Sequence, residues 1–155
     1  MERIAVGADH AGYWLKEEII RFLQASGYPV EDMGTSGEES VDYPDYAARV
    51  ARAVATGQAD LGILICGTGI GMSITANKVR GIRAAVATDS YMARMAREHN
   101  DANILCLGGR VLGAGSALEI VQAFLQSRFA GGRHARRVEK IQALEHVGAK
   151  DPSSP

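Results

Sequence analysis

Short apolar segments alternate along the chain with stretches whose apolar residues have helical spacing. The expected strands are Arg3–Ala8, Pro29–Met33, Leu61–Cys66, Ile82–Ala87 and Asn103–Leu107. Strands that are apolar throughout and alternate with helices are typical of a parallel sheet covered on both faces. Because crossovers between parallel strands are right-handed, we expect a doubly wound, Rossmann-like α/β fold with five strands.

The segments between the strands predict helices. The first ends at Gly27, with Trp14 on its apolar face and Lys16 on its polar, solvent-facing side. Later helices are expected from about Pro44, after the GTGIG sequence, over about 90–98, around Leu118–Leu125, and after the Gly131-Gly132 pair. The length of 155 residues fits one α/β domain, residues 1–147, followed by a flexible tail, residues 148–155.

Composition excludes several classes of protein. The 17 basic and 18 acidic residues nearly cancel, which argues against a nucleic-acid-binding domain. No apolar stretch approaches the roughly 18 residues that a membrane span needs, and the start of the chain has no signal peptide pattern. Cys66 and Cys106 lie in apolar runs without the spacing of zinc or disulfide frameworks, so we expect a cytoplasmic protein without metal.

Basic residues gather near the end of the chain, within residues 128–140. Arg133 and Arg137 are four residues apart and therefore project from one face of the last helix. On a nearly neutral protein, such a pair fits a small anion such as a phosphate. The alternative is a solvated helix face without a ligand.

Reactive side chains follow the expected strands. Asp9 and His10 follow the first strand, Cys66 ends the third, and His99 precedes the last. Ligands of open α/β sheets bind at the carboxyl ends of the strands, so we expect carboxylate, imidazole and thiol at one edge of the sheet. Such a group would suit an enzyme that transfers protons.

The sequence GTGIG follows Cys66 directly. It does not match the dinucleotide fingerprint, which needs glycine where Met72 stands, and it lacks the lysine of a phosphate-binding P-loop. Two uses remain, a tight turn between strand and helix or a ring of backbone N–H groups for a phosphate or an oxyanion. At a helix N-terminus the Cys66 thiol should have a lowered pKa, whereas Cys106 is expected to be inert core packing.

Several separated motifs together resemble one family. They are IAVGADHAGYWLKEEI, DMGT followed by VDYPDYA, ILICGTGIGMSITANKVRGIRAA, EHNDANILCLGGRV and GGRHARRVEKI. In this order, over about residues 2–145, they resemble the type B ribose-5-phosphate isomerases. That family also contains isomerases of allose 6-phosphate and galactose 6-phosphate.

The resemblance implies a cofactor-free aldose–ketose isomerase of the pentose phosphate pathway, which moves a proton through a cis-enediolate. It assigns catalysis to Cys66 as base, to His99 as the acid that opens the sugar ring, and to Thr68. It assigns substrate binding to Asp9, His10, Tyr43, Gly67, Gly69, Ile70, Gly71, Asn100, Arg110, Arg133 and Arg137. It also implies a homodimer, or a dimer of dimers, in which each site takes residues from two subunits.

Other functions stay open at this point. A non-catalytic module could bind a phosphosugar or nucleotide through the glycine loop and the arginines, and Cys66 would then be dispensable. A cysteine-based transferase or hydrolase would form a covalent adduct at the same thiol. An isomerase acting on a six-carbon sugar phosphate would keep the same chemistry in a pocket of slightly different depth.

Overall fold

This computed structural model describes residues 1–148, and the side chains of residues 1–146. The strands are β1 (Ile4–Ala8), β2 (Val30–Asp32), β3 (Leu61–Cys66), β4 (Ala84–Val86) and β5 (Ile104–Gly108). The helices are α1 (Tyr13–Ala25), α2 (Tyr43–Ala55), α3 (Ile70–Ala76), α4 (Ser90–Glu98), α5 (Ala114–Gln126) and α6 (Arg133–Gly148). All five strands therefore form where they were predicted, although the two outer ones are shorter. Apart from Gly148, the predicted tail lies outside the described residues.

The sheet has the order β2-β1-β3-β5-β4, and every neighbouring pair is parallel. The chain passes from β1 to β2 at one side of the sheet, returns to β3 beside β1, and then continues to β4 at the other side before β5 fills the place between β3 and β4. The predicted doubly wound α/β fold is confirmed. The point at which the strand order reverses lies between β1 and β3, where folds of this type bind their ligands.

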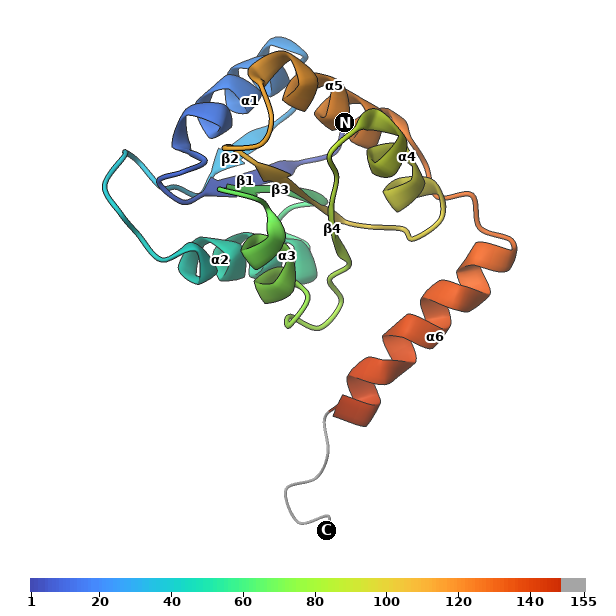
Figure 1. The fold of residues 1–155 in the computed structure, drawn as a ribbon. Coiled ribbons are helices and arrows are strands. Elements are labelled where there is room, and N and C mark those ends of the chain that lie inside the picture. Colours follow the sequence, from blue (N-terminus) through green and yellow to red (C-terminus); the bar gives the residue numbers. More distant parts are fainter. Residues whose placement is uncertain (149–155) are drawn as a thin grey trace, which may run out of the picture.

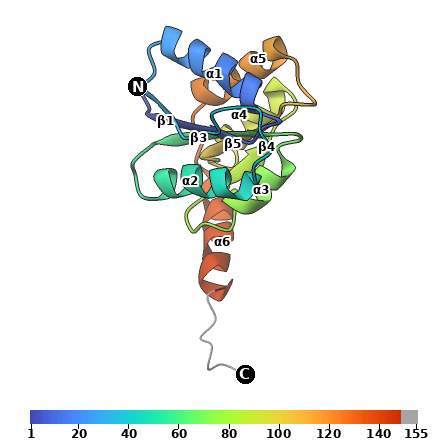
Figure 2. The same ribbon diagram turned by 90° about the vertical axis from the view of Figure 1, so that its left-hand side faces the viewer.

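Helices cover both faces of the sheet, as Figures 1 and 2 show. Helices α1, α4 and α5 pack on one face, against alternate strand residues such as Val6, Ile63 and Leu105. Helices α2 and α3 pack on the other, against the intervening residues such as Leu64 and Cys106. The central strands β1, β3 and β5 are buried on both faces, which explains why their sequences are apolar throughout rather than alternating, whereas β2 and β4 at the sides of the sheet are partly exposed.

Two residues of α1 do not lie where the helical spacing predicted. Trp14 has 62% of its surface exposed, and its indole N–H donates to Glu38 at 2.6 Å. Lys16, predicted to face solvent, is completely buried. Its ammonium group lies 2.8 Å from Glu17 and 2.9 Å from Asp32; burial alone would lower the pKa of Lys16, but these two partners outweigh it and raise the pKa.

Helix α6 leaves the body of the domain and extends away from the sheet (Figure 1). Two contacts hold it to the domain: Val138, in its second turn, is buried, and Glu145, in its last turn, accepts the N–H of Gly81 at 2.9 Å. Further along the predicted apolar stripe, Ile141 and Leu144 are 47% and 66% exposed. The stripe predicted for this helix is thus only partly covered by the described part of the chain.

Candidate active site

The carboxyl ends of β1, β3 and β5 meet at one end of the sheet, and we call this end the thiol edge. The N–H of Asp9 donates to the carbonyl of Ile65 at 3.1 Å, and that of Gly109 donates to the carbonyl of Cys66 at 2.7 Å. These bonds link the loops that follow β1 and β5 to the end of β3. Asp9, Cys66 and the segment from Gly108 to Arg110 therefore belong to one structural unit.

Cys66 ends β3 and is 5% exposed. The N–H of Gly69 donates to its Sγ at 3.1 Å, so the sulfur faces the backbone of the glycine loop. Gly69 has φ of +85°, and a Cβ atom on it would lie 3.0 Å from the backbone of Leu107. Only glycine fits this position without strain. The turn directs the loop back over the thiol, and α3 begins at the next residue.

Thr68 lies exposed on the outside of this loop. Its hydroxyl oxygen accepts the N–H of Ile70 at 3.1 Å, which occupies one of the free amides at the start of α3. Two amides of the loop therefore already have partners within the protein, Gly69 on the sulfur and Ile70 on the hydroxyl. A ligand oxygen at the loop would have to compete for these donors or use the others.

Asp9 and His10 line the same edge with defined orientations. The buried carboxylate of Asp9 accepts the N–H groups of Ala11 at 2.9 Å and Gly12 at 3.1 Å. His10 accepts the N–H of Val41 on its Nδ1 at 3.2 Å. A ring nitrogen that accepts carries no proton, so the neutral imidazole holds its proton on Nε2 and can donate from there.

Two further predicted residues flank the loop. A Cβ atom on Gly71 would lie 2.5 Å from the ring of Tyr43, so the tyrosine packs directly on the first turn of α3. A Cβ atom on Gly67 would lie 3.7 Å from the guanidinium of Arg110, which is exposed above the loop. The structure therefore brings Tyr43, Arg110 and the glycines together with the thiol.

His99 and Asn100 do not lie at the thiol edge, and the prediction of one common edge is wrong for a single chain. Helix α4 follows β4 and runs back across the sheet, so its end at His99 lies near the amino ends of β4 and β5. There the N–H of Asn103 donates to the carbonyl of Arg83 at 2.9 Å. We call this side the imidazole edge.

The basic residues of α6 also lie at the imidazole edge. The ring of His134 stacks on that of His99, with centroids 4.1 Å apart and planes 11° from parallel. Burial, helped by His99 and by the neighbouring Arg133 and Arg137, lowers the pKa of His134. Both arginines are exposed one turn apart, so they can act on one anion. No role is predicted for His134 from the sequence, although its four-residue spacing from the apolar Val138 is a signal for burial.

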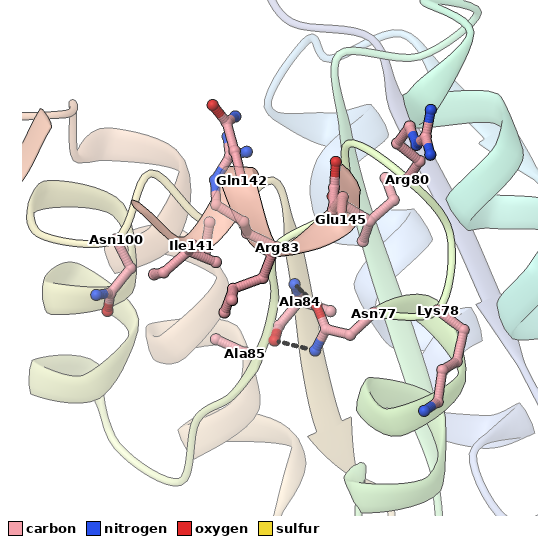
Figure 3. A pocket seen from close by; sticks show the side chains of 13 residues that line it. Asn77, Lys78, Arg80, Arg83, Ala84, Ala85, Asn100, Ile141, Gln142 and Glu145 are labelled. Atoms are coloured by element: carbon pink, nitrogen blue, oxygen red, sulfur yellow. Dashed lines mark hydrogen bonds between the residues drawn. The ribbon is translucent and has the colours of Figure 1, made fainter. Parts of the chain in front are cut away.

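A cavity of about 860 Å³ lies at the imidazole edge, between α6 and the segment that leads into β4 (Figure 3). Asn100 lines it together with Arg83, Asn77, Ile141 and Glu145. Cys66 is not among its lining residues. The Cys66 thiol and this cavity thus lie at different ends of the chain's own sheet.

Cys106 differs from Cys66 in its surroundings. It is fully buried in β5 between the two layers, and burial, with a smaller effect of Cys66, raises the pKa of its thiol far above the usual range. This confirms the prediction that Cys106 is core packing. Within residues 1–148, no three side chains of His, Cys, Asp and Glu converge as a metal site, and no helix is long and apolar enough to cross a membrane.

Comparison with known proteins decides the family. The model of the Ribose/Galactose Isomerase family matches residues 4–141. The chain belongs to this family. It is 52% identical over 145 residues to ribose-5-phosphate isomerase B of Escherichia coli (strain K12), covering 94% of this chain and 97% of that protein. It is 48% identical over 148 residues to D-erythrulose-4-phosphate isomerase of Pectobacterium atrosepticum, with the same coverage of 94% and 97%.

Solved structures of the Ribose/Galactose Isomerase family have the same fold. The structure of ribose-5-phosphate isomerase B from Clostridium thermocellum superposes with a TM-score of 0.94 at 60% identity, covering 95% of this chain and 99% of that chain. The type B enzyme of Trypanosoma brucei gives 0.90 at 52% identity, covering 94% and 99%. These relatives span nearly the whole described fold, including the start of α6.

Proposed function

We propose that this protein interconverts ribose 5-phosphate and ribulose 5-phosphate without a cofactor. Two relatives that carry the name ribose-5-phosphate isomerase B are 52% and 60% identical to it over almost the full chain. The observation that carries the proposal is the position of Cys66, whose sulfur faces the amides of a glycine loop at the strand-order reversal of the sheet. A base beside fixed donors is what enediolate chemistry requires.

In this mechanism the Cys66 thiolate removes the proton from C2 of the open-chain aldose. The electron pair moves into a C1–C2 double bond, and the carbonyl oxygen becomes an enediolate oxygen held by amides of residues 67–71. The same sulfur returns the proton to C1, while a proton passes from the C2 hydroxyl to the oxygen on C1. Thr68 lies on the rim of the loop, where its hydroxyl can assist this oxygen-to-oxygen transfer.

The rest of the thiol edge binds and orients the sugar phosphate. His10 presents an N–H from Nε2, because its Nδ1 is occupied by Val41. Asp9 presents a carboxylate that two backbone amides hold in place. Tyr43 packs beside Gly71 and limits the depth of the site, and Arg110 adds a positive charge above the loop. Fixing the sugar in one orientation can supply much of the rate enhancement.

A complete site needs the thiol edge of one subunit and the imidazole edge of another. His99 and Asn100, together with the arginines of α6, lie too far from Cys66 within one chain to act on one sugar. We therefore propose a homodimer, or a dimer of dimers, in which His99 opens the ring and Arg133 and Arg137 bind the phosphate of a sugar held on the partner's thiol edge. The exposed apolar side chains of α6, Ile141 and Leu144, fit a helix that packs on a second copy.

The name of one relative supports a second candidate substrate. The Pectobacterium atrosepticum protein, at 48% identity, acts by name on a four-carbon sugar phosphate. Six-carbon substrates remain a further alternative within the family. The two free cysteines favour a reducing, cytoplasmic compartment for any of these activities.

The test is a panel of four-, five- and six-carbon sugar phosphates, assayed for aldose–ketose exchange in the absence of metal and nucleotide. We expect ribose 5-phosphate to give the highest kcat/KM. Cys66→Ala should fold and bind substrate but lose nearly all turnover, and Cys106→Ala is the matched control that stays active. Full activity of Cys66→Ala would exclude the thiol as the base, and no exchange on any member of the panel would exclude the isomerase.

A further inference from the structure

Asp101 has an unusual backbone conformation directly beyond His99 and Asn100. Its φ is +47°, the only positive φ of a non-glycine residue within residues 1–148. The N–H of Asp101 donates to the carbonyl of Arg97 at 3.2 Å and closes the end of α4. Glycine is the usual residue at such a left-handed helix terminus, because it has no Cβ atom to be strained.

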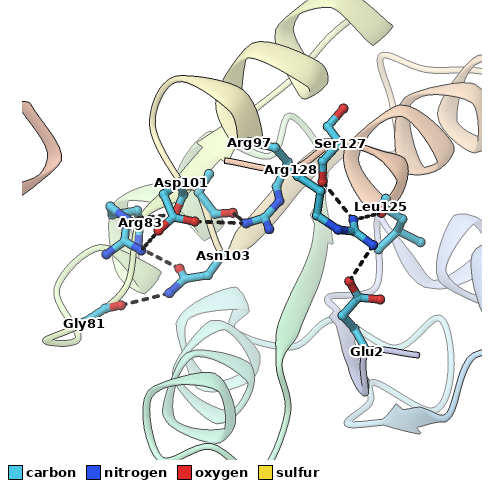
Figure 4. A network of polar contacts seen from close by, with 10 residues as sticks. Glu2, Gly81, Arg83, Arg97, Asp101, Asn103, Leu125, Ser127 and Arg128 are labelled. Atoms are coloured by element: carbon cyan, nitrogen blue, oxygen red, sulfur yellow. Dashed lines mark hydrogen bonds and ion pairs between the residues drawn. The ribbon is translucent and has the colours of Figure 1, made fainter. Parts of the chain in front are cut away.

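The side chain and backbone of Asp101 hold two arginines from different elements (Figure 4). Its carboxylate lies 3.4 Å from the guanidinium of Arg83, at the start of β4, and 3.5 Å from that of Arg97, on α4. Arg83 also donates from Nε to the backbone carbonyl of Asp101 at 2.8 Å. The carboxylate is therefore a bridge between the edge of the sheet and the last turn of α4.

Arg97 makes this bridge costly to disrupt. Its side chain is 12% exposed and packs over the ring of Phe124, with 5.4 Å from the guanidinium carbon to the ring centroid. It also donates to the carbonyl of Ala102, while its buried Nε has no hydrogen-bond partner within the described residues. Asp101 supplies the one carboxylate that pairs with this arginine in that part of the chain. A buried guanidinium without such a partner is strongly unfavourable.

We propose that Asp101 is a positioning residue, which holds His99 and Asn100 in the orientation needed to act on the sugar. The inference rests on the proposed isomerase function. Glycine would adopt the same φ at lower cost, but it would give up both ion pairs. The backbone of His99 is then held from two sides. Its N–H donates to the carbonyl of Met95 at 2.8 Å, and the ion-pair bridge of Asp101 lies directly beyond Asn100. Its ring stays parallel to that of His134.

The variant Asp101→Gly separates positioning from stability. It keeps the left-handed conformation and removes strain, but breaks the bridge; Asp101→Asn, which also tolerates this conformation, removes only the charge. The matched control is Asp60→Asn, because Asp60 also pairs with an arginine, Arg3 at 3.0 Å, at an exposed place before β1 and β3 that does not include His99, Asn100 or Asp101. All three variants should remain folded, as checked by thermal unfolding.

The first readout is the NMR spectrum of the four histidine rings, which does not depend on activity. In the wild type the stacked rings shift each other's proton signals, and in Asp101→Gly the signals of His99 and His134 should move toward those of exposed histidines. His10 should not change. The second readout is kinetic: kcat on ribose 5-phosphate, which must be ring-opened, should fall by about tenfold or more.

A four-carbon aldose 4-phosphate cannot form a five-membered ring, because its 4-oxygen carries the phosphate. Its turnover should therefore fall less than that of ribose 5-phosphate in Asp101→Gly and Asp101→Asn. Unchanged histidine signals, or equal losses on both substrates, would overturn the inference while leaving the isomerase intact. A wild-type protein without isomerase activity would instead refute the proposed function, and the histidine signals would still report whether the bridge fixes the ring.

Discussion

Two inactive variants should restore activity to each other if each site takes residues from two subunits. Within one chain, Cys66 pairs in register with Gly108, whereas Ile104 pairs with Gly62 at the opposite end of β3. Four residues of strand at about 3.3 Å each separate these ends by about 13 Å. His99 lies beyond the amino end of β5, so its distance from the thiol is greater still.

A base and an acid that act on one pentose must each come within about 3 Å of the atoms they serve. The spacing within one chain does not allow this, but a partner's imidazole edge placed over the thiol edge does. Cys66→Ala should lack the base at both sites of a dimer, and His99→Asn should lack the acid at both. Each variant alone should therefore have little activity on ribose 5-phosphate.

Mixing the two variants in equal amounts, with unfolding and refolding to exchange subunits, yields half mixed dimers by random association. Each mixed dimer has one site with both Cys66 and His99 and one site with neither. The mixture should therefore recover about a quarter of the wild-type activity, as expected for an isologous two-fold interface. The assay is the initial rate of ribulose 5-phosphate formation before and after refolding, with each variant refolded alone as the control.

Activity that stays at the level of the single variants, in a sample shown by mass spectrometry to contain mixed dimers, would refute the shared site. Recovery without subunit exchange would equally contradict the reasoning, because separate dimers hold no complete site. A value well above a quarter, with each variant alone inactive, would mean that more than half of the dimers are mixed. The fraction of wild-type activity that the refolded mixture recovers is therefore a direct test of the separation between the two edges.

Three further outcomes are expected. Arg137→Ala should weaken the binding of ribose 5-phosphate, measured by titration, by about ten- to a hundredfold, because a charge-assisted hydrogen bond is worth about 1.5–3 kcal/mol. Arg137→Lys should recover part of this affinity. A loss of binding free energy below about 1 kcal/mol, even with Arg133→Ala added, would indicate a solvated helix face. The lowered pKa of His134 means that the unfolded chain binds more protons, so the free energy of unfolding should decrease as the pH falls below about 6.5, and His134→Asn should reduce that slope in denaturant titrations. Lys16→Met should change the free energy of unfolding by no more than about 1 kcal/mol, because it replaces a buried charge while Asp32 stays 48% exposed and hydrated; a loss of several kcal/mol would show that the ion pair itself stabilises the fold.

The sheet and the thiol edge could be predicted because the sequence there obeys local rules. The segments of β1, β3 and β5 are apolar throughout and buried on both faces, a pattern that is typical of a covered parallel sheet. Cys66 ends such a segment and is followed by glycines, and the left-handed conformation of Gly69 is what that composition favours. Parallel strands then bring Asp9 and His10 to the same edge as the thiol, so local patterns were sufficient here.

The environment of Lys16 could not be derived from periodicity. A helical pattern assigns a charged residue to the solvent side, but it contains no information on a carboxylate presented by a neighbouring strand. Asp32, sixteen residues later, lies on edge strand β2 and reaches the ammonium group at 2.9 Å. The exposure of Trp14 has the same origin, because its hydrogen bond to Glu38 depends on a loop whose conformation no local rule specifies.

The position of His99 was mispredicted for a different reason, since the rule that would have placed it was available. In a parallel sheet every crossover helix runs opposite to the strands, so the end of such a helix lies at the amino edge. His99 and Asn100 end a crossover helix and precede β5, and they must therefore lie across the sheet from residues that follow a strand. Applied at the outset, this rule separates Cys66 from His99 without any coordinates. A sequence that carries a base at one edge and its expected acid at the other then favours a site assembled from two chains, before any interface is known.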